Sequence, residues 1–338
     1  MSSAHADVLQ STIDAIATPG KGILAADEST STITKRFASI NLESTEENRR
    51  AYRTLLCTTP ELEKYISGVI LFEETLFQKA NDGTPLPQIL ANKGIIPGIK
   101  VDKGLIPFAS NPHEKVTQGL DGLPERLQDY QQAGARFAKW RVVFDITTNT
   151  PSRLAIHTNA ELLGRYAAIC QAQGIVPIVE PELLMDGDHD LARAERETEK
   201  ILHHVFLALY RHHVTLEHII LKPNMVVDGK KASNRANAQA VAAATLKVLR
   251  RTVPAAVPTI NFLSGGQTPS EATANLNAIN AQSQPWHLSY SYGRALQEPC
   301  LMAWKGNAEN INTAQSELLK RARLNSAAVM GQYQAHME

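Results

Sequence analysis

The sequence has few cysteines, no excess of charge of either sign and no long apolar run. Its 338 residues include three cysteines, and 34 Lys and Arg residues balance 34 Asp and Glu residues. Three cysteines without metal-ligand spacing predict reduced thiols in a cytoplasmic protein. A net charge of zero disfavours nucleic acid or an anionic membrane as the main partner. No run approaches the roughly 20 apolar residues of a membrane span, and residues 1–20 lack the pattern of an export signal.

Hydrophobic residues make up 43% of the chain, enough for one large α/β domain or two smaller ones. Short segments rich in Ile and Val alternate with longer amphipathic segments and recur roughly every 30–45 residues, about the size of a βαβ unit. The predicted strands are 22–27, 66–74, 96–102, 137–143, 176–182, 219–225, 259–265 and 287–292. The predicted helices between and after them are 49–56, 125–133, 160–173, 191–213, 238–251 and 310–330.

Eight strands that alternate with helices predict a closed (β/α)₈ barrel of the TIM type. A doubly wound open sheet is the weaker alternative, because no G-x-G-x-x-G follows the first strand. No linker rich in Pro or Ser divides the chain. We therefore expect a single barrel domain over residues 1–325, including an N-terminal helix. Residues 326–338 would be the end of a C-terminal helix and a short, loose tail.

In such a barrel, catalytic groups lie at the carboxyl ends of several strands. Charged residues stand at or near the ends of the first six predicted strands: Asp27 and Glu28, Glu73 and Glu74, Lys100 and Asp102, Lys139 and Arg141, Glu180 and Glu182, and Lys222. One polar strand end has no special meaning. So many acids and lysines on one rim are much harder to explain by structure alone, and this rim is the predicted active site.

Three lysines, Lys100, Lys139 and Lys222, stand within or at the ends of apolar segments. A lone ammonium is costly to bury, so such a lysine tends to form an ion pair or lose its proton. A neutral amine near other cations can attack a carbonyl group. For one lysine alone, a structural ion pair is the better interpretation, because ion-pair networks also perturb ionisation. Three of them near acids favour a reactive site.

The segments after the last two predicted strands indicate a phosphate site. Ser264-Gly265-Gly266 offers backbone N–H groups that a phosphate can approach closely, because glycine has no Cβ. Loops after strands seven and eight are the frequent phosphate site of this fold. Arg294 can add charge-assisted hydrogen bonds of about 1.5–3 kcal/mol each. A glycine turn alone is more often only a turn, but this position and the nearby arginine predict phosphate binding.

Motifs along nearly the whole chain, from about residue 18 to residue 333, resemble those of class I fructose-bisphosphate aldolases. They are GILAADES (22–29), GIKVDKG (98–104), QGLDGL (118–123), FAKWR (137–141), IVEPE (178–182), LKPNMV (221–226), FLSGGQ (262–267) and SYGRALQ (291–297). The resemblance implies a (β/α)₈ barrel, usually a homotetramer. It also implies metal-free, reversible cleavage of D-fructose 1,6-bisphosphate to dihydroxyacetone phosphate and D-glyceraldehyde 3-phosphate, in glycolysis and gluconeogenesis.

The resemblance implies a role for each catalytic residue. Lys222 would form a Schiff base with the C2 ketone, and Glu180 would carry the proton for dehydration of the carbinolamine. Asp27 would orient or deprotonate the C4 hydroxyl group. Lys139 would keep Lys222 neutral through like-charge proximity and would orient Glu180. Glu182 would hold the lysine pair.

Two sets of substrate-binding residues follow from the same resemblance. The phosphate nearest the keto carbon would be held by Ser264, Gly265, Gly266, Ser291 and Arg294, and Gly293 is a further candidate for substrate or phosphate binding. The candidates for the distal phosphate are Ser29, Thr32, Lys35, Arg36 and Lys100, and Arg141 could support either phosphate. The chain departs from the family at Ser31, where glycine is usual, and it ends at Glu338 without the mobile tail that carries a terminal tyrosine. We therefore expect slower protonation of the enamine, or another proton donor.

Three alternatives remain open from the residues. A metal-dependent aldolase would need clustered histidine ligands at strand ends, and no histidine pair in 203–213 has the i, i+4 spacing of a helical metal site. A non-catalytic sugar-phosphate-binding protein would not need the full set of acids and lysines. A transaldolase would keep the lysine but act on monophosphorylated sugars. We expect a cytoplasmic enzyme with a sugar-phosphate substrate, no metal or other cofactor, and neither nucleic acid nor membrane as partner.

Overall fold

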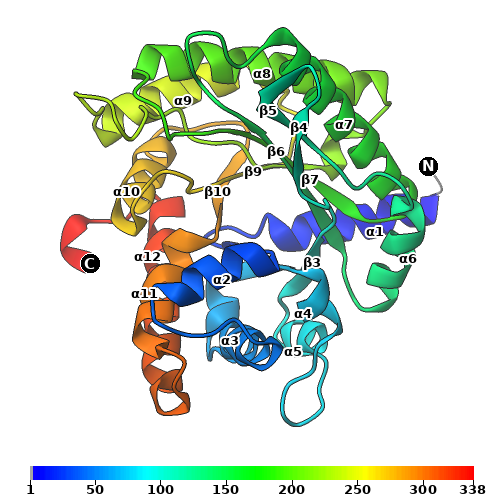
Figure 1. Cartoon of the computed structure of the whole chain (residues 1–338), viewed down its shortest axis with the longest axis vertical. Coiled ribbons are helices and arrows are strands. Elements are labelled where there is room, and N and C mark those ends of the chain that lie inside the picture. The colour runs from blue at the N-terminus through cyan, green and yellow to red at the C-terminus, as the bar shows by residue number, and fades with distance from the viewer. Residues whose placement is uncertain (1–2) are drawn as a thin grey trace.

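Eight parallel strands close into a barrel in the computed structural model, which describes residues 3–338 (Figure 1). The order around the barrel is β1-β10-β9-β8-β7-β6-β3-β2, and each neighbouring pair is parallel. The strands are β1 Gly22–Ala26, β2 Ile66–Leu71, β3 Ile96–Lys100, β6 Phe137–Phe144, β7 Val176–Leu183, β8 Ile220–Leu221, β9 Thr259–Phe262 and β10 His287–Tyr292. The predicted (β/α)₈ barrel is confirmed. Residues 1 and 2, which the predicted domain includes, lie outside the described residues.

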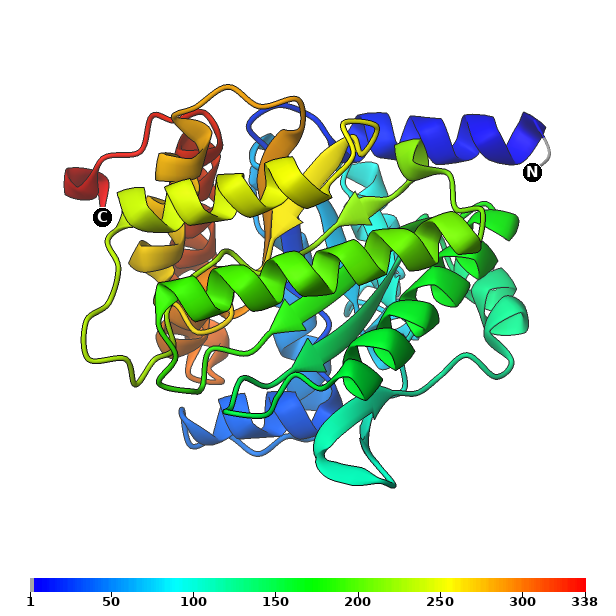
Figure 2. The ribbon, with the colours of Figure 1, turned by 90° about the horizontal axis from the view of Figure 1, so that it is seen from above.

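Helices surround the barrel on its outer side, as Figures 1 and 2 show. Within residues 3–338 they are α1 Ser3–Ile16, α2 Thr30–Ala38, α3 Glu46–Thr58, α4 Glu73–Phe77, α5 Leu86–Asn92, α6 Leu123–Gln132, α7 Arg153–Ala172, α8 Leu191–Arg211, α9 Ala238–Thr252, α10 Pro269–Asn280, α11 Arg294–Trp304 and α12 Ile311–Val329. A large core cluster joins the inner faces of these helices to the outward-facing strand residues. This packing is what a parallel sheet buried on both faces requires.

Helix α1 closes the barrel at the amino-terminal ends of its strands. Leu9, Ile13 and Ile16 of this helix pack with Ile23 and Ile178 of the strands in a second, smaller cluster. All five side chains are at least 98% buried. Helix α1 therefore covers the end of the barrel opposite the carboxyl ends of the strands, where catalytic residues were expected.

The predicted ends of several elements are wrong. β2 stops at Leu71, and Glu73 and Glu74 begin α4 instead of ending the strand. α7 starts at Arg153 with Ser152 as its N-cap, while Asn159, predicted as the start, lies buried inside the helix and donates to the carbonyl of Lys115. Asn favours the N-cap position but is also tolerated within helices, so local sequence does not decide between Ser152 and Asn159 as the residue before the helix.

The segment between β3 and α6 contains an antiparallel hairpin that the sequence did not predict. It consists of β4 Leu105–Phe108 and β5 Asn111–Thr117. Most of its residues are exposed or half-buried, so it lacks the continuous apolar run of a buried strand. The hairpin lies outside the barrel and projects at its side in Figure 2.

Residues 332–338 are not the loose tail that the sequence predicted. The amide of Tyr333 donates to Asn277 of α10 at 2.9 Å, and its hydroxyl donates to Glu338 Oε1 at 3.0 Å. The buried guanidinium of Arg321, in α12, donates to Glu338 Oε2 at 2.5 Å. These long-range contacts hold the segment against α10 and α12, and none of them follows from local composition.

Candidate active site

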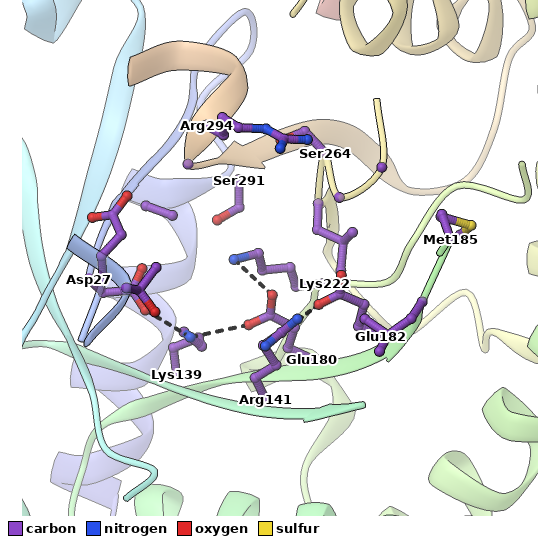
Figure 3. Close-up of a pocket in the computed structure, with 18 of the residues that line it drawn as sticks. Asp27, Lys139, Arg141, Glu180, Glu182, Met185, Lys222, Ser264, Ser291 and Arg294 are labelled. Carbon is purple, nitrogen blue, oxygen red and sulfur yellow. Dashed lines mark hydrogen bonds and ion pairs between the residues drawn. The ribbon is translucent and has the colours of Figure 1, made fainter. Parts of the chain in front are cut away.

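A cavity of about 380 Å³ is lined by residues at and just beyond the carboxyl ends of the strands. Lys139 comes from β6 and Glu180 from β7, while Asp27 directly follows β1 and Lys222 directly follows β8. Their side chains converge in the cavity, as Figure 3 shows. Four of the five residues that the sequence predicted for catalysis are thus brought together from positions up to 195 residues apart (222 − 27).

The four side chains form one chain of ion pairs. Lys222 Nζ lies 3.1 Å from Glu180 Oε1, and Lys139 Nζ lies 3.5 Å from Glu180 Oε2. Lys139 Nζ also lies 2.8 Å from Asp27 Oδ2. Lys139 is therefore shared by two carboxylates, and Glu180 is shared by two lysines. Proton transfer between Lys222 and Glu180 needs no bridging group at this distance.

Lys222 is positioned by its backbone although it lies outside the assigned strand. β8 is only two residues long, but the Lys222 amide still donates to Val179 of β7 at 2.9 Å. Pro223 follows and has no N–H to continue the ladder, although its carbonyl accepts from Leu263 at 3.0 Å. The predicted strand 219–225 was therefore too long, but the pairing that fixes the direction of Lys222 is present.

Electrostatics keep Asp27 and Lys139 charged. Burial alone would raise the pKa of Asp27, but the charges of Lys139, Lys222 and Lys100 outweigh burial and hold the pKa far below its ordinary range. Burial alone would lower the pKa of Lys139, but the carboxylates led by Asp27 and Glu180 hold it well above its ordinary value. At neutral pH the cavity therefore contains a fixed carboxylate beside a fixed ammonium.

Glu182 occupies a different place from the one expected. It forms an ion pair with Arg141 of β6, where the sequence predicted that it would hold the two lysines. Burial alone would lower the pKa of Arg141, but the charge of Glu182 outweighs it and raises the pKa above its ordinary value. Glu182 also lies against the glycine turn, since a Cβ on Gly265 would come within 2.6 Å of its Oε1. The Glu182–Arg141 pair thus forms a wall of the cavity.

The cavity contains a set of unoccupied hydrogen-bond donors on the side of β9 and β10. Among the described residues, the amides of Gly265 and Gly266 make no backbone hydrogen bond, and Ser291 Oγ is buried without a partner there. Arg294, at the start of α11, reaches the same region of the cavity (Figure 3). The five residues predicted for the keto-side phosphate all line the cavity, and so does the further candidate Gly293: Ser264, Gly265, Gly266, Ser291, Arg294 and Gly293.

The predicted distal set is only partly brought together. Thr32 and Arg36 line the cavity, but Ser29, Lys35 and Lys100 do not. Lys35 is exposed on α2. Lys100 Nζ is held by Asp102 Oδ1 at 2.6 Å, so it acts on Asp27 through its charge and not by contact. Among the five candidates for the distal phosphate, Arg36 is therefore the cation that lines the cavity.

Sequence reasoning missed the residue that positions Arg36. Glu28 Oε1 lies 3.3 Å from Arg36 Nη1, and Glu28 Oε2 lies 2.7 Å from Arg53 Nη1. Gln297 Nε2 donates to Glu28 Oε1 at 2.9 Å. The available signal was the position of Glu28 directly after Asp27, but its partners lie on α2, α3 and α11. The cavity lining that was also missed includes Leu184, Met185, Asp186, Lys230 and Leu263.

The described residues show neither a metal site nor a membrane span. Residues 3–338 contain no group of three or more His, Cys, Asp or Glu side chains that could hold a metal ion. No helix within this range is long and apolar enough to cross a membrane. The three cysteines are buried as free thiols, so none of them takes part in a disulfide.

Known proteins resemble this chain over nearly its full length. The family model "Fructose-bisphosphate aldolase class-I" matches residues 8–338. A fructose-bisphosphate aldolase of Echinococcus multilocularis is 54% identical over 98% of this chain and 92% of its own length. A cytosolic fructose-bisphosphate aldolase of Arabidopsis thaliana is 55% identical over 98% of this chain and 93% of its own length.

A solved structure agrees with these sequence relatives. The fructose-bisphosphate aldolase of Plasmodium falciparum, crystallised with TRAP and a small-molecule inhibitor, superposes with a TM-score of 0.98 at 52% identity. The superposition covers 99% of this chain and 97% of the Plasmodium chain. With the barrel and the strand-end residues already in place, these matches show that the chain belongs to the class I fructose-bisphosphate aldolase family.

Proposed function

We propose that this aldolase catalyses the reversible cleavage of D-fructose 1,6-bisphosphate through an imine on Lys222. The products are dihydroxyacetone phosphate and D-glyceraldehyde 3-phosphate, in glycolysis and gluconeogenesis. The observation that carries the imine step is the chain Lys222–Glu180–Lys139–Asp27, buried at the base of the cavity. It places an amine, a proton carrier and a fixed carboxylate within reach of one bound sugar.

The residues account for the proton transfers of imine formation and of carbon–carbon cleavage. Lys222 Nζ attacks C2 of the open-chain ketose, and Glu180 delivers the proton with which the carbinolamine loses water. The imine then accepts the electrons of the C3–C4 bond while Asp27 takes the proton of the C4 hydroxyl, so an aldehyde leaves and an enamine remains. Protonation of the enamine at C3 and hydrolysis of the imine release the second product and the free amine.

Two phosphates orient the sugar against these groups. The free amides of Gly265 and Gly266, with Ser291 and Arg294, suit the phosphate nearest the keto carbon. Arg36, with Thr32, suits the distal phosphate. Holding both ends supplies the orientation effect, which contributes up to about 7–11 kcal/mol in favourable systems. Arg141 is held by Glu182, so we assign it to shaping the cavity between the two ends.

Further parts of the proposal rest on the family and its relatives. A class I aldolase has no metal requirement, so we propose catalysis without metal or other cofactor. The cytosolic relatives of Arabidopsis support a cytoplasmic location. We also propose one barrel domain over residues 1–325 and a homotetramer, with a sugar phosphate as the ligand and neither nucleic acid nor membrane as partner.

Borohydride reduction tests the imine directly. We expect sodium borohydride, added with fructose 1,6-bisphosphate, to inactivate the enzyme and leave a covalent adduct on the peptide that contains Lys222. Peptide mass mapping locates the adduct, and borohydride without the sugar is the control. An adduct on another lysine, or loss of activity in EDTA without any adduct, would overturn the imine proposal in favour of another lysine or a metal.

Gly266→Ala tests the phosphate turn. Gly266 has φ +79°, and a Cβ there would lie 2.5 Å from Met185 Cβ. We expect the displaced turn to raise KM for fructose 1,6-bisphosphate about tenfold, the value of one charge-assisted hydrogen bond. Gly83→Ala is the matched control, because Gly83 has φ +83° but nothing within 4 Å of the added Cβ. An equal KM in the two variants would remove the turn from the phosphate site.

A further inference from the structure

Lys230 lies in the loop after β8 and lines the cavity, but the reaction described above does not use it. Its Nζ is 3.0 Å from Asp186 Oδ1, in the loop after β7. Its Cε lies 3.6 Å from the point where a Cβ on Gly266 would stand. The side chain of Lys230 therefore passes directly beside the glycine turn whose amides are free.

The backbone holds Lys230 in this place. Its amide donates to Met185 at 2.7 Å, and the flanking amides of Gly229 and Lys231 donate to the loop after β7 at 2.9 and 3.0 Å. The two loops are so close that a Cβ on Gly229 would come within 2.2 Å of a carbonyl oxygen of Gly187. Met185 in turn touches Gly266. The loops after β7, β8 and β9 thus contact one another beside the cavity, and Lys230 lies where they meet.

The present partner of Lys230 holds it only weakly. The side chains of Lys230 and Asp186 are 43% and 71% exposed, and ion pairs so open to water contribute little net stability. A phosphate dianion carries more charge than one carboxylate, and the free amides of Gly265 and Gly266 would fix it next to the ammonium. The cost of exchanging Asp186 for a bound phosphate is therefore small.

We propose that Lys230 is a further substrate-positioning residue, which leaves Asp186 to contact the phosphate bound at Ser264-Gly265-Gly266. This inference rests on the proposed function, because it takes the glycine turn as the keto-side phosphate site. Asp186 then acts as a counter-ion that competes with the substrate for Lys230. The alternative is that the Lys230–Asp186 pair only braces the two loops.

Two single substitutions separate the interpretations, because Asp186→Asn changes KM in opposite directions under them. We expect Lys230→Met to raise KM for fructose 1,6-bisphosphate about 5- to 10-fold with kcat unchanged, since a contact kept from ground state to transition state changes KM alone. We expect Asp186→Asn to lower KM about twofold, because Lys230 is released to the substrate. If the pair were only a brace, both variants would raise KM and lower the melting temperature together.

The double variant separates release of Lys230 from a general loss of negative charge. In the Lys230→Met background, Asp186→Asn should change KM little, because no ammonium is left to release. An equally large decrease in KM in that background would contradict the proposal. Lys231→Met is the matched control, because Lys231 is exposed, adjacent in sequence and absent from the cavity lining.

Two further ligands test which phosphate Lys230 contacts and distinguish failure of this inference from failure of the proposed function. Fructose 1-phosphate retains the keto-side phosphate, so Lys230→Met should raise its KM by the same factor; an effect confined to the bisphosphate would overturn the assignment.

Binding of 1,6-hexanediol bisphosphate, measured by calorimetry, requires no imine. If the wild type binds this compound and Lys230→Met binds it equally well, the inference fails alone. If the wild type neither binds it nor cleaves the sugar, the proposed function fails as well.

Discussion

Replacement of Lys222 by methionine is expected to lower kcat for fructose 1,6-bisphosphate cleavage about 10⁴-fold or more, because a thioether cannot form the imine. The loss should fall on kcat and not on KM, since the phosphate-binding residues are unchanged. The same variant should give no adduct with borohydride. A coupled assay for the triose phosphate products, together with mass mapping, measures both effects.

The structure predicts that this variant still folds. Glu180 loses one of its two cations but keeps Lys139 at 3.5 Å, so no buried carboxylate is left unpaired. Lys222→Arg is the matched control for charge, because it preserves a cation beside Glu180 and is expected to be equally inactive. If either variant kept more than about 1% of kcat, a loss much smaller than removal of a covalent nucleophile causes, Lys222 would not be the nucleophile.

Lys139→Met is expected to have the largest effect on stability, at about 3–5 kcal/mol. Lys139 is 95% buried in its side chain and is the shared cation of Asp27 and Glu180. Its removal leaves Asp27 buried without the ion pair that keeps it charged. Activity should also fall strongly, because Asp27 would no longer be held as a carboxylate ready to accept the C4 proton. Urea denaturation and steady-state kinetics measure the two losses.

The pH dependence of this loss has a definite sign. In the wild type the pKa of Asp27 is depressed, so its contribution to stability is present above the ordinary carboxyl pKa and disappears only as pH falls through the depressed value. The raised pKa of Lys139 contributes stability that is complete below the ordinary lysine pKa and lost only as pH rises beyond it. The wild type should therefore exceed Lys139→Met most between about pH 5 and 9, and the difference should shrink in acid.

Asp27→Asn is the matched control for this prediction. It removes the carboxylate but leaves Lys139 paired with Glu180, so we expect a smaller loss of stability, about 1–2 kcal/mol, with a comparable loss of activity. A stability difference between wild type and Lys139→Met that stays constant from pH 3 to 8 would show that the ion pair with Asp27 does not account for it.

Much of the fold could be predicted because its signal is local and repeated. Apolar segments at regular spacing indicate parallel strands, and the motif at Lys222 indicates a strand end without knowledge of its neighbours. Element ends were less predictable. β8 is short because Pro223 interrupts the hydrogen-bond ladder, and Glu74 starts a helix, where its carboxylate binds Arg49 at 2.6 Å. The first outcome follows from Pro223 itself, whereas the second depends on Arg49, which lies 25 residues earlier in the chain.

The candidate site could likewise be predicted only in part. The residues that face the cavity follow from strand alternation, since Lys139 and Arg141 share one face of β6, and Glu180 and Glu182 share one face of β7. Their pairing does not follow. Arg141 stands opposite Glu180 in the register yet binds Glu182, while Lys139 stands opposite Ile178 and reaches Glu180, two residues further along the neighbouring strand. The ion-pair partner of a long side chain depends on the direction in which the side chain points and on its distance from charged groups in the folded barrel.

The sequence by itself determined the barrel and the family and led to the proposal of Lys222 as the reactive amine, because strand periodicity and contiguous motifs are properties of neighbouring residues. Only the tertiary structure decided that Lys139 bridges Asp27 and Glu180, that Lys100 stays with Asp102, and that Lys230 stands beside the glycine turn at Gly266. The physical reason is that ion pairing and burial depend on separations of a few ångströms between loops far apart in the chain.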